Sequence, residues 1–123
     1  MISKAWVPSR GEVIWIDCNP QQGCEMRDIH PMLVLSPKTF NQRTGIVIGF
    51  PMTTASYNET NPFAIKYQGP DDKISYILTH QPKSFDWRQR GAKWHPWKTL
   101  PKPVFIEACE RLNQIITLID EKI

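Results

Sequence analysis

The chain has 123 residues, the usual size of one compact domain, so a single domain over residues 1–123 is expected. Hydrophobic residues make up 41% and charged residues 22%, a composition too apolar for a disordered chain. The net charge of +3 is too small to argue for nucleic acid by itself. No apolar run approaches the ~20 residues needed to cross a bilayer, and no secretory signal opens the chain. We therefore expect a soluble, cytoplasmic protein without a membrane contact.

The cysteine count is odd and low, with Cys18, Cys24 and Cys109. It lacks the dense, even framework of a secreted disulfide scaffold, and no CxxC or His-rich spacing is typical of zinc. We expect reduced thiols, no metal ion and no other cofactor. The chain also lacks a phosphate-binding glycine loop of the Walker or Rossmann kind.

Eleven prolines and six glycines cut the chain into short segments, which favours strands and turns over helices. The polar segment after residue 18 is predicted to be a loop, and the stretch 40–45 a short connector or one helical turn. Strands are predicted at 12–17, 31–36, 46–50 (stopped by Pro51), 63–67 and 74–78, with a possible sixth at 83–87.

The apolar period changes at the end of the chain. Apolar residues recur at steps of three and four between Val104 and Ile119, which predicts an amphipathic helix over about 103–120. Pro103 falls in its first turn, where the missing N–H has no partner to lose. A flat sheet would leave edges and apolar residues in water, so we predict a mainly β, α+β fold: a partly closed barrel over about 9–92, capped by the helix.

Several short blocks follow one another in a definite order. They are Gly11–Trp15, Asn19-Pro20 with Gly23 and Glu25, His30-Pro31 before Leu33–Ser36, Phe40-Asn41 with Thr44-Gly45, Pro51–Thr54, Asn61–Phe63 and, above all, Gln81–Gly91. Each block is weak alone, but in this ordered combination the chain resembles the MazF/PemK family.

The resemblance implies the toxin of a bacterial type II toxin–antitoxin pair, with an SH3-like barrel. Such toxins are mRNA interferases: they form homodimers and cleave single-stranded RNA at short sequences without a metal ion. An antitoxin with an acidic, disordered tail inhibits them by lying across the RNA groove. They reach operator DNA only through that antitoxin.

Metal-free RNA cleavage needs three groups. One deprotonates or orients the ribose 2′-OH, one stabilises the charged phosphorane, and one protonates the departing 5′-oxygen. The products are a 2′,3′-cyclic phosphate and a 5′-hydroxyl, and DNA, which lacks the 2′-OH, is not a substrate.

Two catalytic candidates lie on the loop before the second strand. Where the family has an arginine before proline that is implied to act in catalysis, this chain has His30. An imidazole can serve as acid or base but offers no permanent, bidentate fork to a phosphate. Arg27 could supply the missing cation. The alternative for His30 is a loop imidazole bonded to the backbone.

Thr53 and His80 complete the predicted catalytic set. Thr53 matches the threonine that the resemblance places on the scissile phosphate, although a strand-end threonine also commonly satisfies a turn. His80 stands where some members have an acidic residue, so His30 and His80 could divide the acid and base roles. Alternatively both positions have drifted and the protein is weak or inactive. Thr54 would help to bind RNA.

The resemblance places Cys24 and Glu25 on an RNA-contacting loop, where Glu25 would accept a hydrogen bond from a base edge or pair with Arg27. Between residues 83 and 98, cations alternate with tryptophans, as in single-stranded nucleic acid binding; the tryptophans could instead cover the end of the barrel. Trp94–Trp97 departs from the family pattern and could be an elaboration at a dimer or antitoxin surface. The other predicted RNA-binding residues are Gln81, Lys83, Ser84, Arg88 and Arg90.

Three hypotheses follow from these residues. The first is a sequence-selective endoribonuclease toxin, and the second is a barrel that still binds RNA or antitoxin after losing catalysis at His30. The third is a toxin that poisons DNA gyrase, as relatives with this fold do; the Gln81–Gly91 block favours RNA cleavage over it.

Overall fold

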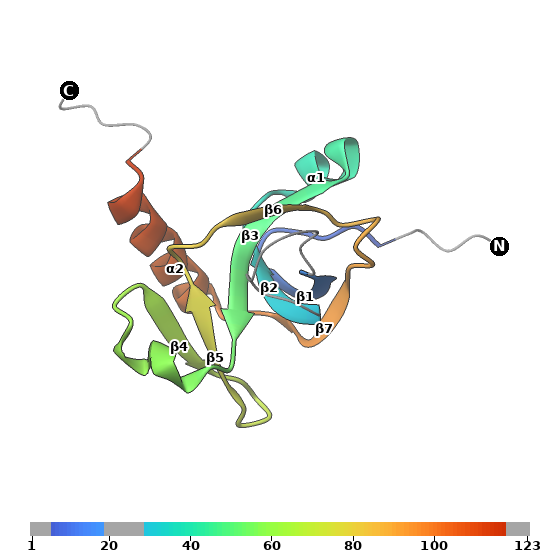
Figure 1. Ribbon diagram of the computed structural model, residues 1–123. Helices are drawn as coiled ribbons and strands as arrows, with labels where there is room; N and C mark the ends of the chain where they lie inside the picture. Colours follow the sequence, from blue (N-terminus) through green and yellow to red (C-terminus); the bar gives the residue numbers. More distant parts are fainter. Residues whose placement is uncertain (1–5, 19–28, 118–123) are drawn as a thin grey trace.

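The computed structural model describes residues 6–18 and 29–117 (Figure 1). The described chain forms a mainly β structure with one long helix, α2, at its end. The elements are β1 (Glu12–Asp17), β2 (Ile29–Val34), α1 (Lys38–Thr44), β3 (Ile46–Thr53), the 3₁₀ helix η1 (Ser56–Thr60), β4 (Ala64–Gln68), β5 (Ile74–Leu78), β6 (Lys83–Asp86), β7 (Lys93–Thr99) and α2 (Lys102–Ile115). No helix in these two ranges is long and apolar enough to cross a membrane.

The strands form one antiparallel, strongly bent sheet in the order β4-β5-β3-β2-β1-β7, with β6 paired to β3. The long strand β3, which crosses the middle of Figure 1, serves three partners. It pairs with β2 at Gly49–Pro51, with β6 at its start and with β5 at its end. Because β3 pairs with different strands along its length, the sheet bends and curls into a half-barrel, as predicted.

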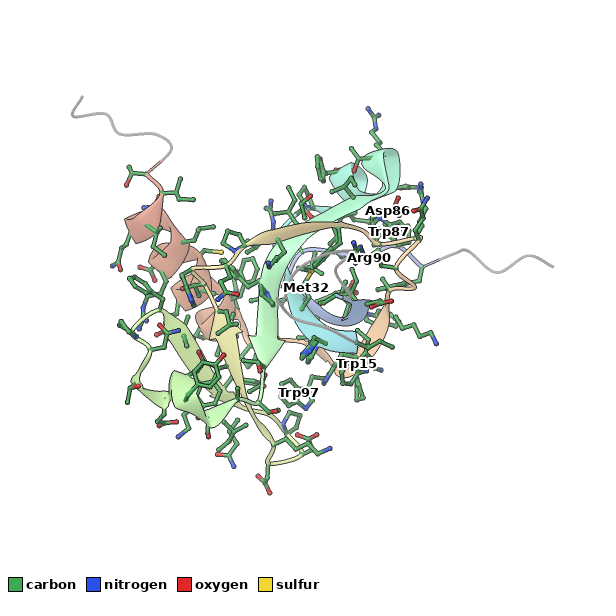
Figure 2. All side chains as sticks on the ribbon, viewed as in Figure 1. Trp15, Met32, Asp86, Trp87, Arg90 and Trp97 are labelled. Carbon is green, nitrogen blue, oxygen red and sulfur yellow. The ribbon has the colours of Figure 1, made fainter. Side chains whose placement is uncertain are left out.

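A tryptophan bridges the two ends of this strand order. Trp97 of β7 packs against the Tyr67 ring of β4 at 5.3 Å between centroids, and its Nε1 donates to Asp71 Oδ1 at 3.0 Å. Gly69 approaches the indole so closely that a Cβ there would lie 2.2 Å from the ring. Figure 2 shows Trp97 between the β4–β5 hairpin and β7. Side chains thus link β4 to β7, although no ladder joins these two strands in the described chain.

The core consists of two apolar clusters, one on each face of the central strands. Ile14, Ile16 and Met32 pack with Trp87 in the first cluster, and Val13 and Leu33 pack with Ala108 of α2 in the second. Residues 13–16 of β1 and 32–34 of β2 therefore have neighbours on both faces of the sheet and are largely buried, which explains why these two stretches are continuous apolar runs. In Figure 1, α2 lies beside β4 and β5, away from β7.

The predicted strands are all present; β1 and β5 have the predicted bounds, and the others have shifted ends. β2 ends at Val34, before the predicted Ser36, because the N–H groups of Leu35 and Ser36 both donate to Ile48 O and break the ladder. β3 continues past Pro51, which faces Met32 inside the ladder, to Thr53.

Two further expectations need correction. The predicted helix over 103–120 begins one residue earlier and ends at Ile115, where a β-branched run weakens helix propensity. The barrel predicted over about 9–92 extends further along the chain, because β7 (Lys93–Thr99), which contains Trp94–Trp97, is a seventh strand that pairs with β1.

Candidate functional site

A cleft of about 370 Å³ opens where β1, β2, β3 and β7 meet the β4–β5 turn. It contains three residues of the predicted site: His30, Thr53 and Thr54. The other lining residues come from β1, β2, β5, β7 and the β4–β5 turn and are mostly apolar or aromatic: Trp15, Ile29, Pro31, Asp71, Lys73, Ile74, Ser75, His95, Pro96 and Trp97.

The sheet register places His30 and Thr53 at this cleft. His30 lies in β2 opposite Ile16, and Thr53 is the last residue of β3, opposite Tyr76 of β5. Thr53 Oγ1 accepts a hydrogen bond from the Ala55 N–H at 3.2 Å. Because this bond uses a lone pair, the hydroxyl proton remains a donor that a phosphate oxygen could accept.

A second imidazole, His95, lines the same cleft. Its ring packs against Trp15 at 4.6 Å and against Trp97 at 4.8 Å between centroids, and the residue is only 8% exposed. Its Nδ1 accepts the Trp97 backbone N–H at 3.0 Å, so the neutral ring carries its proton on Nε2. Burial lowers the pKa of His95, with the charge of Lys73 acting in the same direction and that of Asp71 against it.

His95 is not among the site residues predicted from the sequence. It lies in the stretch between residues 83 and 98 where cations alternate with tryptophans, and Trp15 lies in the strand predicted at 12–17. The aromatic residues of Trp94–Trp97 were the sequence feature that pointed to this part of the site. They could not be placed beside Trp15 from the sequence, because that requires the pairing of β7 with β1.

Among the described residues that line the cleft, Asp71 is the one carboxylic acid, and its hydrogen-bond donors are defined. Burial acts to raise the pKa of Asp71, but hydrogen bonds from the Lys73 N–H and from Trp97 outweigh it and leave the pKa below its ordinary value. Asp71 is therefore ionised at neutral pH. Nowhere in the described chain do three His, Cys, Asp or Glu side chains gather in a way that could hold a metal ion.

His80 is not brought to this cleft within one copy of the chain. It follows the end of β5 opposite to Ile74 and Ser75, and that strand spans roughly 13 Å. There its ring lies 5.9 Å from that of Phe63, and its Nε2 lies 3.2 Å from Gln81 Nε2. The role of His80 as a proton shuttle remains a prediction.

The predicted RNA-binding arginines make structural contacts. Arg88 donates to Gln42 O at 2.9 Å, and Arg90 donates to Asp17 O at 2.9 Å. Their guanidinium groups also lie over the rings of Trp87 and Phe85, respectively. Each arginine thereby links the segment after β6 to another part of the barrel; Figure 2 labels Arg90 beside Asp86 and Trp87. A contact of either with RNA stays a prediction.

Lys83 and Ser84 lie on β6, opposite Gly49 and Ile48 of β3. Lys83 and Arg90 lie near Cys18, and both lower the pKa of its thiol, but burial dominates and raises it to about 11. Cys18 and Cys109 are free thiols, as expected. Cys24, Glu25 and Arg27 lie outside the described residues.

Residues 9–116 match the family described as the PemK-like, MazF-like toxin of type II toxin–antitoxin systems. This match spans most of the chain and includes every element from β1 to α2. The chain belongs to this family.

Individual relatives agree with the family match. The chain is 38% identical over 92 residues to the endoribonuclease toxin MazF of Escherichia coli K12, covering 75% of this chain and 79% of that one. It is 27% identical over 110 residues to the endoribonuclease PemK of Escherichia coli, covering 88% and 81%.

Among solved structures, MazF of Deinococcus radiodurans superposes with a TM-score of 0.81 at 28% identity, covering 93% of this chain and all of that one. A MazE–MazF complex from the same organism matches with a TM-score of 0.76, also at 28% identity and with the same coverage.

Proposed function

We propose that this chain is the toxin of a type II toxin–antitoxin pair and an endoribonuclease that cuts single-stranded RNA, the mRNA of the cell included, at short sequences. Its membership of the toxin family and its likeness to MazF and PemK endoribonucleases carry this conclusion. In the proposed mechanism, the ribose 2′-OH attacks the adjacent phosphate and no metal ion takes part.

The cleft supports this mechanism through two neighbouring groups. His30 is the candidate acid or base, and the Thr53 hydroxyl is the candidate donor to the phosphate oxygens. Both line one cleft although they lie on different strands, which fits a shared role at one ribose–phosphate linkage. Arg27 is the proposed cation beside them, and His80 the proposed second proton carrier.

The partners are also part of the proposal. Because solved relatives are complexes of MazE with MazF, we infer a cognate antitoxin for this chain, with an acidic, disordered tail that covers the RNA groove. The chain would act as a homodimer in the cytoplasm and reach operator DNA only through the antitoxin.

The test is incubation of the purified protein with a long single-stranded RNA in EDTA, followed by mapping of the new ends. We expect discrete cuts with 2′,3′-cyclic phosphate and 5′-hydroxyl ends, and no cut where a 2′-deoxynucleotide replaces the attacking ribose. Cleavage that needs a divalent cation, or that tolerates the deoxy substitution, would contradict the mechanism.

Variants assign the roles in the same assay. His30→Ala and Thr53→Ala should each reduce the rate by roughly a hundredfold, the usual cost of losing an acid–base group or a phosphate donor. Thr60→Ala, which removes an exposed threonine hydroxyl in η1, is the matched control and should cleave normally. Normal cleavage by His80→Ala would return His80 to a structural role.

A binding protein without catalysis is the second candidate, because His30 replaces the arginine of the family pattern. RNA that is bound but never cut would support it. Inhibition of DNA gyrase with intact RNA would instead identify a gyrase toxin.

A further inference from the structure

We propose that the cleft binds one unstacked nucleobase of the RNA, of the kind that carries an exocyclic amino group, beside the phosphate contacted by His30 and Thr53. The aromatic walls of this base site are Trp15 and Trp97, and its hydrogen-bond acceptor is Asp71. The inference rests on the proposed function and adds to it a base-binding site with assigned residues.

The size and lining of the cleft suit a single base. Its volume of about 370 Å³ lies at the small end of the range for ligand pockets, roughly 300–1,000 Å³. Ile29 and Ile74 also line it although they are 62% and 38% exposed, which leaves apolar side chains open to solvent at the same place. Stacking against aromatic rings is how proteins hold the bases of single-stranded RNA.

The aromatic walls are held in place before any ligand arrives. Trp97 is fixed by its Nε1 bond to Asp71, by its backbone bond to His95 Nδ1 and by its packing on Tyr67. The buried ring of His95 in turn packs against Trp15. A preformed wall costs little conformational entropy when the base binds, so most of the stacking energy remains available for affinity.

Asp71 gives the site a preference among bases. Its Oδ1 accepts hydrogen bonds from Trp97 Nε1 and the Lys73 N–H, and a carboxylate offers about four lone-pair positions in all. The remaining positions can accept a base amino group, which adenine, cytosine and guanine carry and uracil lacks. Lys73 lines the same cleft, and its point charge suits a phosphate next to the base.

The first experiment measures binding and does not depend on cleavage. Short RNAs made only of adenosine, only of cytidine or only of uridine are compared with an abasic ribose–phosphate chain of equal length, by fluorescence polarisation at one salt concentration. The adenosine and cytidine RNAs should bind about ten- to hundredfold more tightly than the abasic chain. The affinity of the uridine RNA should lie between that of the abasic chain and those of the adenosine and cytidine RNAs.

Two variants connect this preference to the cleft. Trp15→Ala should weaken binding of the adenosine RNA about tenfold and leave the abasic chain unaffected, since that chain has nothing to stack. Tyr57→Ala, which removes a ring that is 79% exposed in η1, is the control and should change neither. Asp71→Asn adds an amide donor at the acceptor position and should reduce the difference in affinity between the adenosine and uridine RNAs. This variant tests the base site even if Trp15→Ala fails to fold.

The inference is overturned if the abasic chain binds as tightly as the adenosine RNA. It is equally overturned if Trp15→Ala weakens both ligands alike while Asp71→Asn leaves the base preference unchanged. If the wild-type protein shows the base preference but cuts no RNA, this result would contradict the proposed function and still support the base site.

Discussion

The neutral imidazole of His95, packed between Trp15 and Trp97, makes the stability of the protein depend on pH. Burial lowers the pKa of His95 in the fold, below the ordinary value of 6.5 that applies when the chain unfolds. As the pH falls below about 6.5, the unfolded chain therefore takes up a proton that the folded protein resists. This difference favours unfolding, so the stabilising contribution is present near neutrality and is lost in mild acid.

We therefore expect the free energy of unfolding to decrease between pH 7 and pH 5, and His95→Gln to reduce this dependence. Urea unfolding at several pH values measures both slopes. His95→Gln also removes packing, so its stability is expected to be lower at every pH, and only the slope tests the titration. Equal slopes in the two proteins would contradict the assignment.

At the scale of elements, the close approach of β3 to β2 depends on Gly49. A Cβ at this position would lie 2.2 Å from Leu33 O, a backbone atom that cannot turn aside. Gly49→Ala must therefore move the strands apart, and we expect it to cost about 1–3 kcal/mol, the usual penalty for overpacking a core.

Urea unfolding with an unchanged m-value measures this cost for Gly49→Ala. Ser84→Ala is the control, because it shortens an exposed side chain on β6, the strand next to Gly49, and should change the stability by less than about 0.5 kcal/mol. A Gly49→Ala protein as stable as the wild type would show that the two strands can separate without loss.

Element by element, the sequence predicts regular patterns well and irregular ones poorly. Strands β1 and β5 have the predicted bounds because β-branched runs and neighbouring turns define them. β7 was missed because Pro96 and the tryptophans give no strand alternation. Proline is tolerated at the edge of a sheet, and β7 is the last strand in the order. Its pairing with β1 is irregular, with a register shift opposite Glu12–Ile14, and Lys98 has a positive φ of 61°.

The site follows the same division. His30, Thr53 and Thr54 were predicted from their places in ordered sequence blocks, and the structure brings all three to one cleft. His95 and Asp71 could not be predicted, since they meet only through the pairing of β7 with β1 and the contact of Trp97 with the β4–β5 hairpin. Long-range pairing of this kind leaves no local pattern in a sequence.

At the scale of the whole molecule, charge limits how strongly RNA can be held. The net charge is only +3, and between residues 83 and 98 five cations face one acid. Two of these cations, Arg88 and Arg90, are bonded to backbone carbonyls. Affinity for RNA should therefore come from a few phosphate contacts together with base stacking.

We expect the logarithm of the RNA association constant to fall with the logarithm of salt concentration at a slope of about −2 to −3.5, as for three to five phosphate contacts. Lys83→Gln should make this slope shallower by about 0.7, the loss of one contact, whereas Lys102→Gln at the start of α2 should leave it unchanged. Fluorescence polarisation with a non-cleavable RNA at several salt concentrations gives the slopes. A slope near zero would show that stacking alone holds the RNA, and equal effects of the two lysine variants would show that the contact is not specific to β6.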